Sequence, residues 1–190
     1  LDKSIDLARK SVAYDPVSSS AYANLGYSCY YAFRLDEAAS SFRKSISLNP
    51  ERFRAYVYLG RVLLAQGQLQ EAVEMIQKAP DHPIRQAGLA IAYHALGDED
   101  TSNKILVELI ENWGESMAFQ IAEIYAFSGE IDAAFEWLQK ALDTRDPGLN
   151  VLLGNPVFDK LAFDGRYQSL VEQMGLLQYW QEMNLEQSDA

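Results

Sequence analysis

Apolar and small residues recur along the first half of the chain at the spacing of amphipathic helices, and the whole pattern repeats every 34 residues. The recurring positions are Leu25-Gly26 with Leu59-Gly60, Glu37-Ala38 with Glu71-Ala72, and Pro16 with Pro50. A repeat of this length holds one helical hairpin, which cannot bury its apolar face alone and is covered by its neighbours. The sequence therefore predicts an array of stacked helix pairs.

Cap and turn residues place the helices within each pair. The serines at 18–20 supply N-cap chemistry for a helix over 19–32, and Asp36-Glu37 opens a second over 36–48. Asn49-Pro50 ends that helix, because proline cannot continue the hydrogen-bond ladder. Later pairs turn at Gly67, Gly97 and Gly129, whereas Phe33 holds the equivalent position in the first complete pair. We expect a local repacking there, because phenylalanine tolerates a positive φ poorly.

The repeats divide the chain into an array over residues 1–143 and a C-terminal helical cap and tail over 144–190. The array consists of a half unit at 1–16 and helix pairs at 17–50, 53–80, 84–112 and 115–143. Because the half unit starts in the middle of a repeat, we expect the chain to be a fragment of a longer protein. Without its first helix, the half unit should expose a seam around Ile5, Ala8 and Val12.

The residue types within the repeat are specific. They are Tyr22-x-x-Leu25-Gly26-x-x-Cys29, then Ala38-x-x-x-Phe42, then Pro50. This pattern resembles the tetratricopeptide repeat family. The resemblance implies an all-α fold, a right-handed α-α superhelix with short C-terminal capping helices, that binds a peptide or protein in its concave groove. Cys29 occupies a position that this repeat buries, so we interpret it as a core residue.

The C-terminal stretch carries a second resemblance. Its residues are Phe135-x-Trp137-Leu138, Asn155-Pro156-x-Phe158-Asp159 and Asp164-x-Arg166-Tyr167. They are similar to the ending of repeat regions in bacterial signalling proteins, where the repeats follow a CadC-type winged-helix domain, a class III nucleotide cyclase domain or a protein kinase. The resemblance implies a regulatory C-terminal part of a larger cytoplasmic signalling or transcription-regulatory protein.

In the tetratricopeptide family the first helices of the pairs line the groove. Helical spacing places there Tyr27, Tyr30, Tyr31, Arg54, Val57, Arg61, Ile91, His94, Phe119, Glu123 and Phe127. Arg54 and Arg61 lie seven residues apart on one helix face, so we expect an acidic anchor on the bound peptide. The Lys and Asn side chains with which some family members hold a terminal carboxylate are absent, which argues against chaperone-tail binding. The three tyrosines are equally compatible with packing against neighbouring helices alone.

Charge is unevenly distributed along the chain. Residues 1–61 hold 9 basic and 6 acidic residues, whereas residues 62–190 hold 7 basic and 21 acidic residues. Phosphate binding needs clustered Lys and Arg, so no direct nucleic-acid contact is expected. No apolar run approaches the ~20 residues that span a bilayer, and the single cysteine excludes an intrachain disulfide and suits the cytoplasm.

Catalytic patterns are absent from the sequence. It holds no glycine-rich phosphate loop, no His-Glu-x-x-His and no nucleophile elbow. His82 and His94 lie in different contexts, so we expect no metal site and no cofactor. The leading interpretation is a non-enzymatic interaction and scaffold domain. Two alternatives stay open: a small-molecule sensor that uses the aromatic groove, and a self-association module that forms a homodimer.

Overall fold

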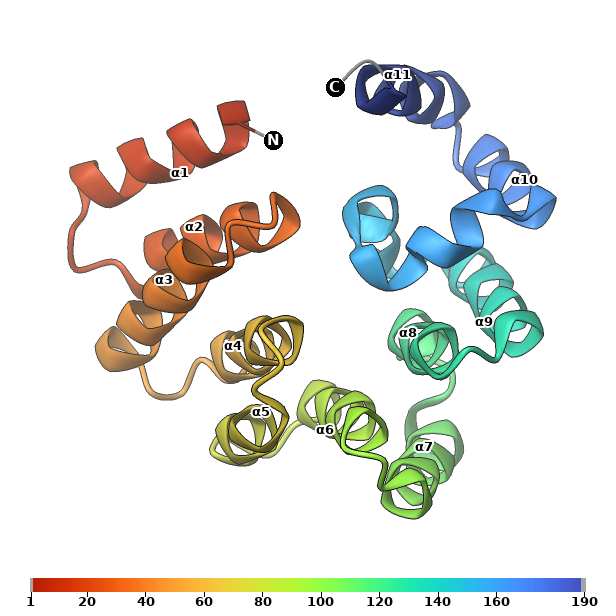
Figure 1. Cartoon of the computed structure of the whole chain (residues 1–190), viewed down its shortest axis with the longest axis horizontal. Coiled ribbons are helices and arrows are strands. Elements are labelled where there is room, and N and C mark those ends of the chain that lie inside the picture. Colours follow the sequence, from red (N-terminus) through yellow and green to blue (C-terminus); the bar gives the residue numbers. More distant parts are fainter. Residues whose placement is uncertain (1, 189–190) are drawn as a thin grey trace. The chain divides into compact units, whose positions relative to one another are not determined.

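The computed structural model describes residues 2–188, and of side chains those up to residue 182. Every regular element in this part of the chain is a helix, and none is a strand (Figure 1). The first seven helices are α1 (Asp2–Tyr14), α2 (Ser19–Tyr31), α3 (Leu35–Leu48), α4 (Phe53–Ala65), α5 (Leu69–Gln77), α6 (Pro83–Ala95) and α7 (Glu99–Trp113). They are followed by α8 (Ala118–Ser128), α9 (Ile131–Asp143), the 3₁₀-helices η1 (Pro147–Gly154) and η2 (Pro156–Phe163), α10 (Gly165–Gln173) and α11 (Leu177–Ser188).

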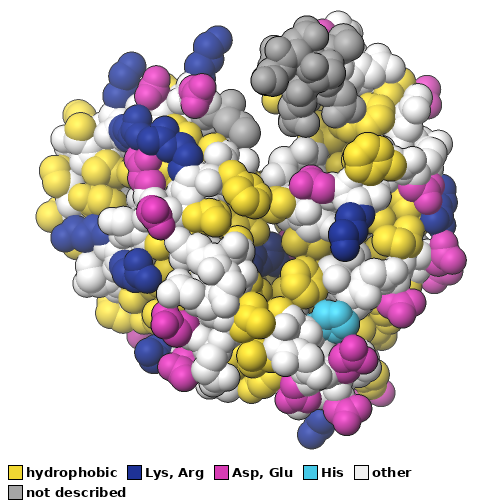
Figure 2. All heavy atoms as spheres, in the orientation of Figure 1, with side chains coloured by type: hydrophobic (Ala, Val, Ile, Leu, Met, Phe, Trp, Pro, Cys, Tyr) yellow, Lys and Arg dark blue, Asp and Glu magenta, His cyan; other side chains and the backbone are white. Residues whose placement is uncertain are grey.

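The chain divides into two units, residues 1–111 and residues 112–190. In the first unit α2 pairs with α3 and α4 pairs with α5, as the repeat predicts (Figure 1). In the second unit α8 pairs with α9. Side chains of both charge signs lie on the face shown in Figure 2. Among the described residues, no helix combines the length and the apolar character needed to cross a bilayer.

Glycines let the two helices of a pair approach closely. A Cβ on Gly26 would lie 2.7 Å from Phe42 Cε1, and a Cβ on Gly60 would overlap the side chain of Ile76. Both partners, Phe42 and Ile76, are fully buried. Cys29 is also buried, in agreement with the sequence interpretation.

The turn at Phe33 differs from our expectation. Instead of a local repacking, Phe33 adopts the left-handed conformation of the turn glycines, with φ of 58°, against 76° at Gly67. The N–H of Arg34 donates to the carbonyl of Cys29 over 2.8 Å, just as Gln68 donates to Leu63 over 2.9 Å in the next pair. The Phe33 ring stays 66% exposed. The hydrogen-bonded turn therefore holds Phe33 in a backbone conformation that favours glycine.

The expected exposed seam on α1 is wrong. Ile5 and Ala8 are buried and Val12 is half-buried, because this face of α1 packs against α2. The hydroxyls of Ser4 and Ser28 lie 2.8 Å apart across the same contact. The exposed face of α1 instead carries Leu7 and Tyr14, which are 64% and 94% exposed.

In the second unit the regular pairing gives way to the two 3₁₀-helices, which pack on α8 and α9. Phe158 and Leu161 of η2 join Leu138 of α9 in one buried cluster, which α10 extends with Tyr167. Each 3₁₀-helix begins with a proline whose preceding polar residue caps it: the side chain of Asp146 accepts from Gly148 N–H over 2.8 Å in η1. The apolar surface of α8 and α9 is thereby covered by short helices.

Candidate functional site

Tyrosines from α2 and α4 meet in the first unit. The ring of Tyr58 on α4 stands edge-on to Tyr27 on α2, with centroids 4.6 Å apart. Tyr30 and Tyr31 approach the same ring, at 5.7 and 6.4 Å. The hydroxyls of Tyr31 and Tyr58 share a hydrogen bond of 3.0 Å. We call Tyr27, Tyr30, Tyr31 and Tyr58 the tyrosine cluster.

Tyr58 is the centre of this cluster, and sequence reasoning missed it. The signal that identifies it is its spacing: Tyr58 follows Arg54 by four residues and precedes Arg61 by three, so all three share one face of α4. Helical spacing from the arginines therefore predicts Tyr58 as readily as it predicts Val57.

The tyrosine cluster is partly buried. Tyr30 is buried, while Tyr27, Tyr31 and Tyr58 keep part of their surface exposed. Burial, together with the nearby Tyr58, raises the pKa of Tyr27 to about 12, although Arg54, Arg52 and Arg61 oppose the shift. The Tyr27 hydroxyl is thus a neutral hydrogen-bonding group in the field of guanidinium groups.

Arg54 and Arg61 share a helix face but differ in exposure. Arg61 is only 7% exposed, and its guanidinium lies 5.1 Å from the centroid of the Tyr58 ring. Arg54 is exposed, with its guanidinium 5.7 Å from the Phe53 ring. Because a stacked arginine fixes an aromatic ring, Arg61 is placed to position Tyr58, whereas Arg54 is open to an incoming group.

The other predicted residues of the first unit lie on α4 and α6. Val57 and Ile91 are buried, and a Cβ on Gly88 would lie 2.8 Å from Val57 Cγ1. Val57 therefore belongs to the close contact between α4 and α6. His94 lies in the last turn of α6 and is partly buried.

The three predicted residues of the second unit lie on α8. Phe119 is buried edge-on to Phe158 at 5.4 Å, so it is a core residue. Glu123 is 2% exposed, and its Oε1 accepts a hydrogen bond of 2.7 Å from the Asn155 amide. Phe127, near the end of α8, is 36% exposed.

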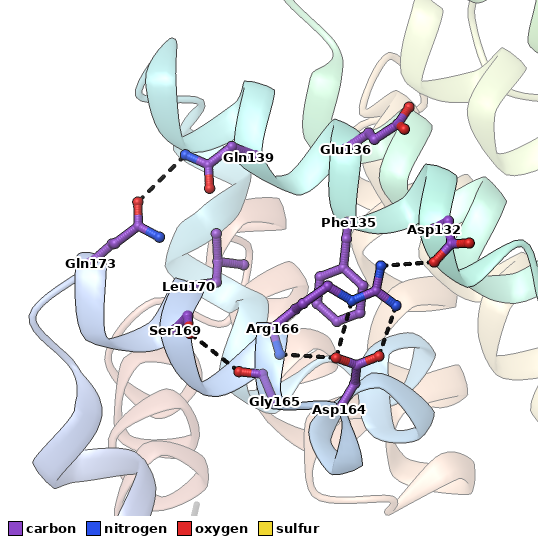
Figure 3. Close-up of a pocket in the computed structure, with 10 residues that line it drawn as sticks. All are labelled: Asp132, Phe135, Glu136, Gln139, Asp164, Gly165, Arg166, Ser169, Leu170 and Gln173. Carbon is purple, nitrogen blue, oxygen red and sulfur yellow. Dashed lines mark hydrogen bonds and ion pairs between the residues drawn. The ribbon is translucent and has the colours of Figure 1, made fainter.

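A separate groove of about 830 Å³ lies between α9 and α10 (Figure 3). The guanidinium of Arg166 spans it, over the Phe135 ring at 4.3 Å and bound to Asp132 at 2.7 Å and Asp164 at 2.8 Å. Asp164 also caps α10, because its Oδ1 accepts from the Arg166 backbone N–H. The C-terminal sequence pattern contains Phe135, Asp164 and Arg166 but not Asp132, and only the structure shows that these residues join α9 to α10.

Metal ligands are not gathered anywhere in the described part of the chain: no three His, Cys, Asp or Glu residues there are arranged to hold an ion. His82 serves a structural role instead. Its Nδ1 accepts a hydrogen bond of 3.1 Å from the Ile84 N–H at the start of α6.

Comparison with known families identifies the repeat. Residues 30–83 and residues 116–146 each match a family model described as tetratricopeptide repeat. Part of each unit therefore matches the tetratricopeptide repeat. Such repeats generally mediate protein–protein interaction and scaffolding. A search of curated proteins found no match to the chain.

Several solved structures share the fold, and two of them are described as tetratricopeptide (TPR) proteins. TTC0263 of Thermus thermophilus is 17% identical, with 88% of each chain covered and a TM-score of 0.62. YrrB, described as having an unusual peptide-binding site, is 17% identical over 96% of this chain and 98% of its own, with a TM-score of 0.50. MamA is 22% identical over 74% of this chain and 86% of its own, with a TM-score of 0.52. The predicted fold class, an all-α tetratricopeptide superhelix with short C-terminal capping helices, is confirmed.

Proposed function

We propose that the chain is a non-enzymatic interaction module that binds an acidic peptide segment on the face formed by α2 and α4 in the first unit. Tyrosine and arginine are the residues that most often carry binding energy at protein interfaces. The observation that carries the proposal is the exposed guanidinium of Arg54 beside a tyrosine cluster that is only partly buried.

Each residue of this face has a separate proposed role in binding. Arg54 is the anchor for a carboxylate of the peptide, and Tyr27 and Tyr31 supply contact area with hydroxyls at their tips. Tyr58 on α4 fixes these rings, and Arg61 positions Tyr58 because its guanidinium lies over the Tyr58 ring. Buried side chains such as Val57 act by holding α4 in place and not by touching the partner.

The remaining predicted residues extend the proposal beyond this face. Ile91, His94, Phe119, Glu123 and Phe127 lie on α6 and α8, the first helices of later pairs. His94 keeps exposed surface and is proposed as a further contact in the first unit, and Phe127 is proposed as a contact of the second unit by itself, whereas Ile91, Phe119 and Glu123 are buried.

We also propose a cellular context. The similarity of the ending around Asn155-Pro156 and Asp164-x-Arg166-Tyr167 to bacterial signalling proteins supports a regulatory role next to a transcription-regulatory, cyclase or kinase domain in the cytoplasm. The acidic balance of residues 62–190 supports a protein partner over a nucleic acid. Sequencing the complete gene tests this context directly, because an adjoining winged-helix, cyclase or kinase domain would be recognised in the encoded protein.

The binding proposal is tested with a library of Asp- and Glu-containing dodecapeptides, measured by fluorescence polarisation. Arg54→Glu should weaken the selected peptides by about tenfold or more, because it replaces attraction with repulsion at the anchor. Arg43→Glu, which makes the same charge change on the exposed face of α3, is the matched control and should change affinity little. Equal losses in both variants would show a general charge effect and contradict the site.

The alternatives give different results in the same preparation. A small molecule that raises the melting temperature of the wild type, but not that of the double variant Tyr31→Phe/Tyr58→Phe, would favour the small-molecule sensor. Sedimentation that depends on protein concentration would favour self-association. Neither outcome requires an acidic peptide to bind.

A further inference from the structure

His82 joins two helices of the first unit through one imidazole. Its Nδ1 accepts the N–H of Ile84 over 3.1 Å and so caps the N-terminus of α6. Its ring also stacks on Phe53, the first residue of α4, with centroids 3.8 Å apart and planes 13° from parallel. The side chain therefore ties the start of α6 to the start of α4.

Only the neutral imidazole can make the capping bond. A protonated imidazole has hydrogens on both nitrogens and no lone pair left to accept the Ile84 N–H. Its positive charge would also face the positive end of the α6 dipole. We propose that His82 is a pH-sensitive latch, closed while the imidazole is neutral and opened when it is protonated.

The charged groups around His82 favour the closed state. Burial and the Arg54 guanidinium on α4 lower the pKa of His82, and Asp81 in the same connection raises it by less. Arg85 of α6 forms an ion pair with the Asp81 carboxylate at 3.5 Å, and it also donates a hydrogen bond to the Ala79 carbonyl. The Phe53 ring attracts an imidazolium, but the pKa of His82 still lies below its ordinary value of 6.5.

The sign of the pH dependence follows. A group whose pKa is lower in the folded state adds stability at pH values above its unfolded pKa. The latch is therefore complete above about pH 6.5 and opens as the pH falls through the lower folded pKa.

The latch has a consequence for binding, which rests on the proposed function. Phe53 directly precedes Arg54, so opening the latch frees the residue beside the peptide anchor. Acidic pH would then weaken peptide binding. The latch itself is tested without any peptide, so its failure and the failure of the binding proposal are separate results.

The test is the hydrogen-exchange protection factor of the Ile84 amide at pH 7.5 and at about one pH unit below the His82 pKa, which an NMR titration measures first. We expect it to fall roughly fivefold or more in the wild type, the population change that accompanies loss of one N-cap. His82→Asn keeps an oxygen that caps the helix but does not titrate, so its protection factor should not change with pH. His94→Asn is the control for the second histidine and should behave as the wild type does.

An unchanged protection factor in the wild type, or an equal fall in His82→Asn, would overturn the latch. Should His82→Asn fail to fold, the wild-type imidazole decides the question by NMR. A His82 pKa below 6.5 with Nδ1 unprotonated in the neutral form supports the latch, and a pKa at or above 6.5 overturns it.

Discussion

Gly26 of α2 lies against the ring of Phe42 on α3 so closely that a methyl group on Gly26 would sit 2.7 Å from Phe42 Cε1. Both residues are buried, and the same relationship recurs one repeat later between Gly60 and Ile76. The hydrogen side chain of glycine thus sets the distance between the two helices of a pair.

Gly26→Val should destabilise the first unit by about 1–3 kcal/mol, because an overpacked contact forces Phe42 or the helix to move. The measurement is the free energy of unfolding in urea. Asn24→Val adds the same side chain to an exposed position of α2 and should change stability by less than about 0.5 kcal/mol. Equal effects of the two substitutions would contradict close packing at Gly26.

Phe33→Gly should stabilise the first unit by roughly 0.5–1 kcal/mol. Relief of a left-handed non-glycine residue, about 1–3 kcal/mol, outweighs the entropy that glycine adds to the unfolded chain. Phe33→Ala keeps a Cβ at positive φ and so should bring no comparable gain. Thermal melts of both variants separate the backbone effect from the loss of the exposed ring. A melting temperature of Phe33→Ala as high as that of Phe33→Gly would contradict backbone strain at Phe33.

Asn155→Ala should destabilise the second unit by about 2–4 kcal/mol. The side chain caps η2 through the Val157 N–H and also donates to the buried Glu123 carboxylate, so both hydrogen bonds are lost. Asn150→Ala, at an exposed position of η1, is the matched control and should have little effect in chemical unfolding.

Asn155→Asp distinguishes the two bonds. It keeps the capping oxygen but sets a second carboxylate against Glu123, so its stability should recover when acid protonates one of the two. Stability that is independent of pH in this variant would show that the bond to Glu123 contributes little.

The Asp164 carboxylate should titrate far below its ordinary range. Hydrogen bonds from the Arg166 side chain, and then from its backbone N–H, lower the pKa of Asp164 to about 2 from 3.8. Because the folded pKa is the lower one, the contribution to stability is present above about pH 3.8 and is lost as the pH falls through about 2. NMR titration of the carboxyl carbon measures it.

Arg166→Gln should raise the pKa of Asp164 toward its ordinary value, while Arg145→Gln, at an exposed position, should leave it unchanged. A wild-type pKa near 3.8 would show that the ion pair between Asp164 and Arg166 does not form in solution.

The helix pairs follow from the sequence because small and apolar residues at fixed spacing have few other ways to pack. The helices predicted over 19–32 and 36–48 are observed as α2 and α3, with ends that differ by one residue. The left-handed turn at Phe33 was not predicted, since residue preference pointed away from it while the hydrogen bonds of the turn required it.

The candidate site was harder to predict because helical spacing identifies a face but not its exposure. In a stacked array a first helix is contacted by its own partner and by the next first helix, so α4 packs on both α5 and α6. Val57 is buried for that reason, while Arg54, three residues earlier, is exposed. Long-range pairs such as Glu123 with Asn155 leave no trace in local spacing.

The central claim is a direct contact between Arg54 and a carboxylate of the bound peptide, and a double-mutant cycle tests it most directly. Affinities are measured for wild type and Arg54→Ala, each with a selected acidic peptide and with its anchor carboxylate replaced by alanine. The account predicts that the two changes interact by about 0.5–1 kcal/mol or more, as expected for an exposed ion pair at an interface. Losses that add within about 0.3 kcal/mol would contradict it and place the acidic anchor elsewhere.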